Sequence, residues 1–343
     1  MGEDKTRFNI RLRTRRELLW TATATIGLGL AGAHDGAGGQ GNTVLKVSTF
    51  PGVTNVPIFA AQHKGFFAKN GLTIDLVYTP NSRVQRDGLA NGEYQIIQTA
   101  ADNCVAMVEL DKTDAIIVAG GDNGFNHIIV QPEINQLSDL RDKTVVVDAP
   151  NTAFALLLYK ALKDSGLNKG DYKVNSVGGT GERLAAMTDD TTNVAAIMGL
   201  PFIFSATAAG LKDMGSAYRS VGAYQSDSAV VMRQWATANR DSLVRYIKAV
   251  VEGRRWLLDP ANKAEATQLL ADKAKVPLDM AGKSYAMLSA PDGGYAKDAK
   301  FDMEGFRNVL KLRAEIEGQW RGNPPLTEKY IDLSYYDQAI AGL

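Results

Sequence analysis

The sequence predicts an α/β protein of about two domains, and three observations support this. Residues 44–78 show a strand pattern, a helix pattern and a second strand pattern, which is the order of a β-α-β unit. Residues 144–162 repeat the order of strand, polar loop and amphipathic helix. In both places the loop follows the carboxyl end of a strand, where open α/β sheets bind ligands, and 343 residues suit about two domains.

The β-α-β unit is delimited by turn and capping residues. Residues 45–49 have the two-residue alternation of a half-buried strand, which ends at the turn signal Phe50-Pro51-Gly52. A short helix follows, with Thr54 or Asn55 as its N-cap. A second alternating strand covers residues 72–76.

This unit contains two short motifs in a fixed order. Lys64-Gly65-Phe66-Phe67 closes the helix, and Gly71-Leu72-Thr73-Ile74 leads into the second strand. The order resembles the opening of the substrate-binding proteins of ABC importers, and among them the SsuA/THI5-like (NMT1-like) subgroup of alkanesulfonate-, nitrate- and thiamine-precursor-binding proteins. The resemblance implies the periplasmic-binding-protein type II fold, in which two hinged α/β domains close over a ligand in the cleft between them.

The resemblance also implies where the chain passes between domains. We expect domain 1 to comprise residues 43–125 and 223–343, and domain 2 to comprise residues 126–222. The step into domain 2 resembles the family's pattern at Asp139 to Lys143, except that Asp142 stands where the family usually has glycine. The turn at Asp142 therefore departs from the family's pattern.

The remaining elements follow from periodicity, caps and turn residues. A helix capped at Asn81 and a helical C-terminal third, interrupted at Pro260, belong to domain 1. The expected strands cover residues 94–99, 115–119, 127–131, 144–147, 174–177, 193–198 and 228–232, and the expected later helices cover 105–110, 154–162, 184–187, 239–259, 264–271, 278–289 and 302–317.

The first forty residues resemble an export signal. Five arginines between Arg7 and Arg16 form a basic region, and residues 18–33 are a mild apolar run that ends in Ala31-Gly32-Ala33, a cleavage pattern. Thr14-Arg15-Arg16-Glu17-Leu18-Leu19 resembles a twin-arginine signal. We expect residues 1–42 to be a signal peptide and linker, and the mature chain to begin near His34 in the periplasm, with an uncleaved basic tail as the alternative.

The composition argues against several function classes. Lysine plus arginine and aspartate plus glutamate both number 38, so the net charge is zero and nucleic-acid binding is not expected. The single cysteine, Cys104, excludes an intrachain disulfide and a multi-cysteine metal site. The three histidines lack zinc-site spacing, and no Gly-x-Ser-x-Gly motif occurs. We therefore expect no catalytic residues, no metal and no cofactor.

Two predicted helix starts face the cleft from domain 2. Residues 149–152 cap the helix that begins near Phe154, and free backbone N–H groups at such a start suit a negative or polar ligand group. Gly178-Gly179-Thr180-Gly181 precedes the next helix, but Glu182-Arg183 follows instead of the Lys-Ser/Thr of a phosphate loop. We therefore interpret the glycine run as a tight turn at the cleft.

The candidate ligand-binding residues share a position in small or polar loops at strand ends. We expect a small organic molecule, aromatic or heterocyclic, held by stacking and hydrogen bonds. A sulfonate or carboxylate held by helix N-termini and Arg83 is the alternative. The candidates are Phe50, Thr54, Asn55, Asn81, Ser82, Arg83, Ala101, Asp102, Asn103, Asp122, Asp148, Asn151, Thr152, Thr180, Pro201 and Phe202.

The export signal and the motif order together predict an extracytoplasmic solute-binding protein. Its expected partners are a small-molecule ligand and the permease of an ABC importer, and it is expected to act as a monomer. The alternatives are a THI5-like or quinone-precursor enzyme of the same fold, and a ligand-sensing module. Fungal THI5-like enzymes carry a cysteine-rich motif that this chain lacks, which argues against the enzyme.

Overall fold

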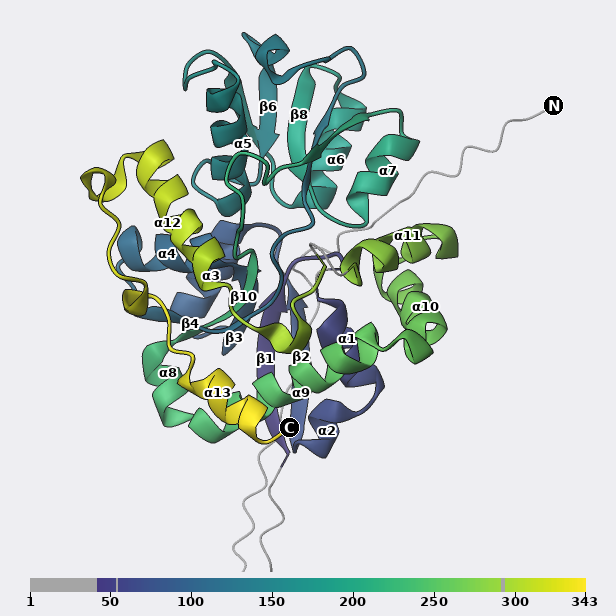
Figure 1. The fold of residues 1–343 in the computed structure, drawn as a ribbon, viewed down its shortest axis with the longest axis vertical. Helices are drawn as coiled ribbons and strands as arrows, with labels where there is room; N and C mark the ends of the chain where they lie inside the picture. The colour runs from purple at the N-terminus through teal and green to yellow at the C-terminus, as the bar shows by residue number, and fades with distance from the viewer. Residues whose placement is uncertain (1–41, 54, 291–293) are drawn as a thin grey trace, which may run out of the picture. The chain divides into compact units, whose positions relative to one another are not determined.

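Two mixed β-sheets organise the chain (Figure 1). The computed structural model describes residues 42–53, 55–290 and 294–343. The strands are β1 Thr43–Thr49, β2 Leu72–Tyr78, β3 Ile96–Ala100, β4 Ala115–Gly120, β5 His127–Val130, β6 Thr144–Val147, β7 Lys173–Ser176, β8 Asn193–Met198, β9 Lys212–Ser216 and β10 Asp227–Met232.

The two sheets have the same plan. In the first sheet, ordered β2-β1-β3-β10-β4, β1 pairs in parallel with β2 and β3, and β10 runs antiparallel between β3 and β4. In the second, ordered β7-β6-β8-β5-β9, β6 pairs in parallel with β7 and β8, and β5 runs antiparallel between β8 and β9. The fold class predicted from the sequence, an α/β protein with the periplasmic-binding-protein fold, is confirmed.

Helices cover the sheets, and three strands, including β4 at the edge of the first sheet, are buried along their whole length. Every residue of β3, β4 and β8 is buried, and their nearly continuous apolar sequences are typical of strands covered on both faces. The helices are α1 Val56–His63, α2 Phe66–Lys69, α3 Ser82–Ala90, α4 Ala101–Glu109, α5 Ala153–Asp164, α6 Thr180–Asp189, α7 Phe202–Ala208, α8 Arg233–Ala238, α9 Arg240–Leu258, α10 Lys263–Ala274, α11 Leu278–Leu288, α12 Met303–Glu317 and α13 Ser334–Ala341.

The long helix α9 packs against α1 at a glycine. The apolar face predicted for α9 is buried, including Leu243, Ile247 and Val251. A Cβ atom on Gly253 would lie 2.4 Å from the carbonyl oxygen of Pro57 and 2.8 Å from the amide nitrogen of Ala61. The absence of a side chain at Gly253 therefore sets how closely the two helices approach.

Two crossover segments connect the sheets: residues 121–126 link β4 to β5, and residues 217–226 link β9 to β10. They are hydrogen-bonded to each other, through Ala217 N to Asn126 O at 2.9 Å and through Ser226 N to Asp122 O at 2.9 Å. Gly124 has a φ of 99°, and a Cβ there would lie 2.1 Å from the Tyr218 ring. The two crossover segments therefore lie side by side.

The start of α4 differs from the prediction. The sequence pattern suggested a helix from Val105, but α4 begins at Ala101, so Ala101, Asp102 and Asn103 form its first turn rather than a loop. The reason is tertiary, because the amide of Ala101 donates to the carbonyl of Ser226 at 2.8 Å. No local pattern reveals that partner.

Five of the described elements were not predicted, namely α2, α7, α8, β9 and α13. Strand β9 reads Lys-Asp-Met-Gly-Ser, which lacks apolar alternation, and it forms through antiparallel pairing with β5. At the turn before β6, Asp142 adopts a left-handed φ of 62°. Aspartate is among the few residues that visit this region, so it replaces the family's glycine without loss of the turn.

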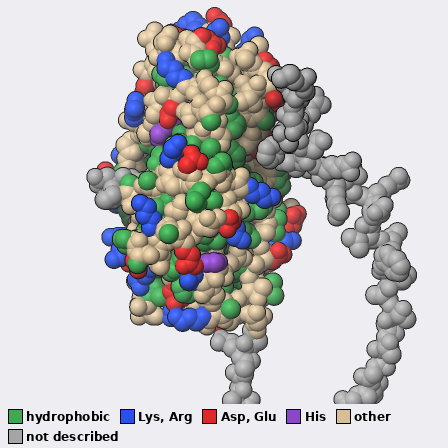
Figure 2. All heavy atoms as spheres, turned by 90° about the vertical axis from the view of Figure 1, so that its right-hand side faces the viewer, with side chains coloured by type: hydrophobic (Ala, Val, Ile, Leu, Met, Phe, Trp, Pro, Cys, Tyr) green, Lys and Arg blue, Asp and Glu red, His purple; other side chains and the backbone are tan. Residues whose placement is uncertain are grey.

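Two predicted features lie outside the described residues. These are Thr54 and the expected export segment, apart from Asn42 at its end. None of the helices in the described part of the chain combines the length and hydrophobicity that crossing a membrane requires. On the face drawn in Figure 2, basic and acidic side chains are interspersed, in keeping with a net charge of zero.

Candidate functional site

A cavity of about 70 Å³ lies where the strand ends of the two sheets face each other. This is several times the roughly 10–15 Å³ that one water molecule needs. Nine of the predicted residues line it, from both sheets. They are Phe50, Asn55, Ser82, Asn103, Asp122, Asp148, Thr152, Thr180 and Phe202.

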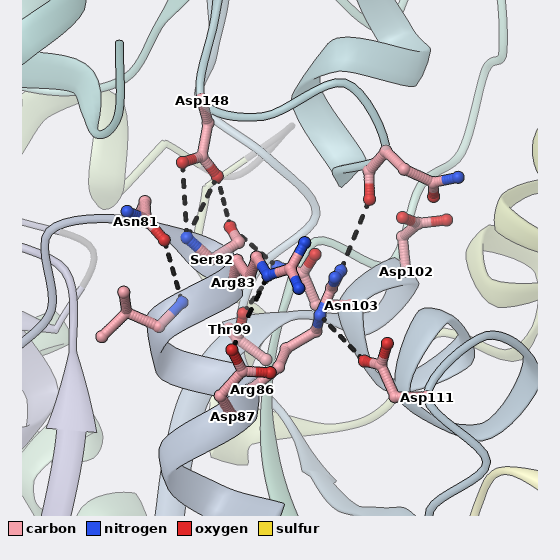
Figure 3. A network of polar contacts seen from close by, with 12 residues as sticks. Asn81, Ser82, Arg83, Arg86, Asp87, Thr99, Asp102, Asn103, Asp111 and Asp148 are labelled. Atoms are coloured by element: carbon pink, nitrogen blue, oxygen red, sulfur yellow. Dashed lines mark hydrogen bonds and ion pairs between the residues drawn. The ribbon is translucent and has the colours of Figure 1, made fainter. Parts of the chain in front are cut away.

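A directed chain of hydrogen bonds connects cavity-lining residues that come from both sheets (Figure 3). Asp148, after β6, accepts from the Ser82 amide at 3.3 Å and from the Ser82 hydroxyl in a short contact. Because the hydroxyl donates to the carboxylate, its oxygen must accept from the Asn103 amide nitrogen, which lies 3.3 Å away and also donates to Thr99 at 2.8 Å. The amide oxygen of Asn103 is then left without a donor among the described residues.

Two carboxyl groups lie at the cavity end nearest the crossover segments. Asp122 is 2% exposed, and its Oδ1 accepts from the Gly124 amide at 2.8 Å, whereas its Oδ2 makes no hydrogen bond of ordinary geometry among the described residues. The Ser226 hydroxyl and the Asp227 amide lie near enough to oppose the effect of burial on the pKa of this carboxyl group. Burial raises the pKa of Asp122. Burial and the neighbouring Asp122 raise the pKa of Asp227 well above its ordinary value.

The groups around this pair only partly compensate its charge. Arg254, on α9, donates to the carbonyls of Gly121 and of Ala296, the latter at 3.0 Å, and its guanidinium lies 4.6 Å from the centre of the Tyr295 ring. With its amide oriented to satisfy both neighbours, Gln98 donates to Asp227 Oδ2 at 3.2 Å and accepts from the Tyr246 hydroxyl at 3.0 Å. These contacts hold the pair in place, and they do not offset the burial that raises the pKa of both carboxyl groups.

Among the described residues, Arg183 is the one arginine in the cavity lining, and its hydrogen bonds go to groups on its own side of the cavity. It is 2% exposed and donates to the carbonyls of Ile197 at 3.0 Å and Gly178 at 2.8 Å. It also donates to the Thr180 hydroxyl at 2.9 Å. Burial lowers its pKa to about 10, so it remains a cation at neutral pH.

Four phenylalanines give the cavity an aromatic wall: Phe50, Phe125, Phe154 and Phe202. Phe125 is held edge-on against Tyr295, with ring centres 5.3 Å apart. The cavity lining contains no His, Cys or Lys among the described residues. The arrangement is therefore suited to stacking and hydrogen bonding.

Six predicted residues lie outside the cavity lining, and two of them act locally on α3. Asn81 caps the helix, with its Oδ1 accepting from Val84 N at 2.9 Å. Arg83 is directed to solvent, with 78% of its side chain exposed, and pairs with Asp87 at 3.7 Å. The six are Asn81, Arg83, Ala101, Asp102, Asn151 and Pro201.

Asp102 and Asn151 belong to a buried network centred on Arg313 of α12. Arg313 Nε and Nη2 donate to the two oxygens of Asp102, at 2.8 and 2.6 Å, and both side chains are almost fully buried. Its Nη1 donates to Asn151 Oδ1 at 2.7 Å. The network therefore joins α4 of the first sheet to the loop before α5 of the second, behind the cavity.

A model of the NMT1-like family matches residues 38–271, which is more than half of the chain. The chain belongs to the NMT1-like family. The resemblance found in the sequence motifs is thereby confirmed. A search of curated protein sequences found no match.

Solved structures similar to this NMT1-like chain are numerous, and at their low identity they show the fold. One, from Bordetella bronchiseptica RB50, has a TM-score of 0.76 and 15% identity, over 88% of this chain and 98% of that one. The periplasmic nitrate-binding protein NrtA of Synechocystis PCC 6803 has a TM-score of 0.73 and 15% identity, over 88% of this chain and 89% of that one. The alkanesulfonate-binding protein SsuA of Xanthomonas axonopodis pv. citri, bound to MOPS, has a TM-score of 0.69 and 16% identity, over 85% of this chain and 99% of that one.

The fold of the NMT1-like chain is also shared with an enzyme. The desulfurization enzyme DSZB has a TM-score of 0.61 and 12% identity, over 88% of this chain and 99% of that one. The similar structures named above are binding proteins where their names state a role. Fold likeness therefore leaves the chemistry of the cavity to be argued from its own residues.

Sequence reasoning missed several residues that line the cavity in this NMT1-like chain. Gln98 and Thr99 were assigned to a strand and Ala100 to the small residues after it, and none was chosen as a candidate, although all three form the end of β3. Ser226 and Asp227 lie at the beginning of β10. They were missed because the predicted candidates all come from loops at the ends of strands. Because β10 is antiparallel to β3, its amino end lies beside the carboxyl end of β3, a placement that only the pairing reveals.

Proposed function

We propose that this NMT1-like protein is an extracytoplasmic solute-binding protein that delivers a small organic molecule to an ABC importer. The observation that carries the proposal is a cavity with an aromatic and polar lining that takes residues from the strand ends of both sheets. The fold is shared with proteins named for binding nitrate and alkanesulfonate, which supports the same general role.

Contacts across the cavity support a clamp mechanism. Besides the Ser82–Asp148 contact, the Gly179 amide donates to the Pro80 carbonyl at 3.0 Å, and Arg86 Nη1 donates to the Asn151 carbonyl at 3.4 Å. We refer to these three as the cross-sheet contacts. A ligand touching both walls adds to them, so its binding favours the closed state.

The domain division and the cellular setting form part of the same proposal. The moving parts are residues 43–125 with 223–343, and residues 126–222, connected by the crossover segments. The protein is exported to the periplasm by the twin-arginine route. It acts there as a monomer, and the permease recognises it in the closed state.

A second candidate is an enzyme of this fold, which the likeness to a desulfurization enzyme favours. It requires turnover of the bound molecule. The cavity holds the Ser82 hydroxyl against Asp148, but the described lining has no histidine to act as a base. An incubation of the protein with each ligand it binds, followed by mass spectrometry, separates the two: unchanged ligand supports binding, and a new product supports the enzyme.

A thermal-shift screen of the chain from His34 tests the binding function. Sulfonates, carboxylates, aromatic acids, amino acids, amines and pyrimidines are the compounds to screen. A ligand that binds only the folded state at 100 times its dissociation constant adds about 2.7 kcal/mol of stability. We expect one chemical class to raise the melting temperature.

A matched pair of variants on α6 shows whether the cavity is the site. Thr180→Tyr places a large side chain in the cavity, whereas Thr188→Tyr changes an exposed residue near the end of the same helix. The ligand-induced rise in melting temperature is expected to disappear in Thr180→Tyr and to persist in Thr188→Tyr. An absence of any shift across the whole screen would contradict the binding function.

A further inference from the structure

We propose that the cavity binds an organic cation, an ammonium or amidinium group carried on a flat apolar body, with Asp122 as its principal anionic partner. This inference rests on the proposed binding function and adds the chemical class of the ligand. It differs from the sequence-based expectation, which left the class open between a neutral aromatic molecule and a sulfonate or carboxylate.

Two hydrogen-bond acceptors in the described cavity wall lack a partner. Oδ2 of Asp122 and the amide oxygen of Asn103 make no hydrogen bond of ordinary geometry among the described residues, and both side chains are 2% exposed. The direction of the Asp148–Ser82–Asn103 chain excludes the opposite orientation of the Asn103 amide. A buried acceptor without a donor costs about 1–3 kcal/mol, so a ligand that brings N–H groups to both positions recovers that cost.

Charge in the lining points the same way. Three carboxyl groups, those of Asp122, Asp148 and Asp227, line the cavity together with a single cation, Arg183. The donors of Arg183 are directed at backbone carbonyls and Thr180. Arg254 approaches the Asp122–Asp227 pair from α9, behind the cavity lining. Acidic side chains therefore outnumber basic ones in the described lining, and a ligand cation would favour the ionised form of the Asp122–Asp227 pair, whose pKa values burial raises.

The aromatic wall suits the same kind of ligand. The face of an aromatic ring attracts an ammonium or guanidinium-type cation, by about 2 kcal/mol or more when the pair is desolvated. Phe50 and Phe202 are partly exposed members of the lining, so their rings are open to a ligand. Phe125 belongs to the same crossover segment as Asp122.

The groups that the sequence suggested for binding a sulfonate or carboxylate already have other partners. Asp148 fills the N-terminus of α3, where a sulfonate or carboxylate would otherwise accept from the Ser82 amide. Arg83 pairs with Asp87 on the surface. The starts of α5 and α6 also border the cavity, and they suit a neutral acceptor group at the other end of the ligand.

A set of six compounds of similar size and different charge tests the class. Benzylamine and benzamidine are cations, benzyl alcohol and benzamide are neutral, and benzoate and benzenesulfonate are anions. Binding to the chain from His34 is measured at neutral pH by calorimetry and thermal shift. We expect both cations to bind at least about tenfold more tightly than their neutral counterparts, and the anions not to bind.

The outcomes separate this inference from the proposed function. Preferential binding of the anions or the neutral compounds supports the binding function and overturns the cation inference. Absence of binding by all six compounds counts against both. Equal binding of cations and neutral compounds overturns the inference alone.

Substitution of the anionic partner gives an independent test. Asp122→Asn keeps an oxygen for the Gly124 amide but removes the charge. The loss of one member of a buried charge pair corresponds to a dissociation constant raised about 30-fold or more for benzamidine, with little change for benzamide. Asp87→Asn, on the exposed face of α3, is the control and should leave the dissociation constants of benzamidine and benzamide unchanged. If Asp122→Asn folds and binds benzamidine as tightly as the wild type, the assignment of Asp122 is wrong.

Discussion

At the scale of single residues, this protein contains two buried charge systems that are compensated to different degrees. Arg313 uses both edges of its guanidinium, on Asp102 and Asn151, and is fully buried. Asp122 satisfies one oxygen only. The complete network suits a structural role behind the cavity, and the incomplete one suits a role in ligand binding.

Arg313→Met should strongly destabilise the protein. The substitution leaves the Asp102 carboxylate buried without its partner, and breaking a buried ion pair from one side costs about 3–5 kcal/mol. Urea unfolding followed by circular dichroism measures the change. Arg83→Met removes an exposed pair and is expected to have little effect. Equal stability of the two variants would show that the buried network contributes nothing.

Asp227→Asn should change how stability depends on pH. Burial and Asp122 raise the pKa of Asp227 in the folded state, so the folded state binds a proton more tightly than the unfolded state does. The stability from this group is present below the unfolded pKa of about 3.9 and is lost as pH rises through the folded value. Compared with the variant, the wild type should therefore lose melting temperature from about pH 4 upwards.

Melting curves of wild type and Asp227→Asn between pH 4 and pH 8 measure this difference. Arg254 attracts the ionised form and thereby limits the effect, while Asp122 enhances it. The tyrosines near the pair, Tyr218 and Tyr295, have pKa values raised by burial and stay neutral over this range. Two curves that run parallel would contradict the raised pKa of Asp227.

At the scale of secondary-structure elements, close helix packing is set by single glycines. Gly253→Ala should be destabilising, because its Cβ would lie 2.4 Å from the Pro57 carbonyl in α1, and overpacking costs about 1–3 kcal/mol. Gly282→Ala in α11 meets nothing within 4 Å and should stabilise by about 0.5–1 kcal/mol through helix propensity. Thermal unfolding of both variants distinguishes packing from propensity: a stabilised Gly253→Ala would mean that α9 moves away at no cost.

Most elements follow from local signals, and the exceptions have physical reasons. Asn81 was predicted to cap α3 and does so, since capping depends on residues three positions apart. The early start of α4 depends on Ser226, which is more than a hundred positions away in the chain, and β9 depends on its pairing with β5. Such partners leave no trace in the short segments that they stabilise.

The same distinction separates the predicted from the missed cavity residues. Phe50, Ser82 and Asp148 were found because they follow the strand ends at which parallel sheets bind ligands. Asp227 was missed because its strand runs the opposite way, and Arg183 because it lies inside a helix. Asp102 was placed at the site because of its strand end, although Arg313 from the other end of the chain engages it.

At the scale of the whole molecule, the cross-sheet contacts join the two walls of the cavity, and in the proposed clamp they restrain its opening. Asp148→Ala removes the strongest of them, since both the Ser82 amide and its hydroxyl donate to that carboxylate. We expect the unliganded variant to have a larger radius of gyration in small-angle X-ray scattering than the wild type. Asp164→Ala, a change to an outer residue of α5 paired with Lys160, is the control. Identical scattering from Asp148→Ala and wild type would show that this contact does not restrain opening.

The position of Asp122 on a crossover segment constrains how a new cargo can evolve in this protein. Its backbone carbonyl accepts from Ser226 in the other crossover segment, and its carboxyl group lines the cavity. Under the proposed function, a change at this residue that suits a different ligand also alters a segment that joins the two sheets, so recognition and release would not be tuned separately there. Thr152, Phe154 and Thr180 line the opposite wall and belong to neither crossover segment. Relatives that differ in cargo but keep the same opening motion should therefore differ first on that wall.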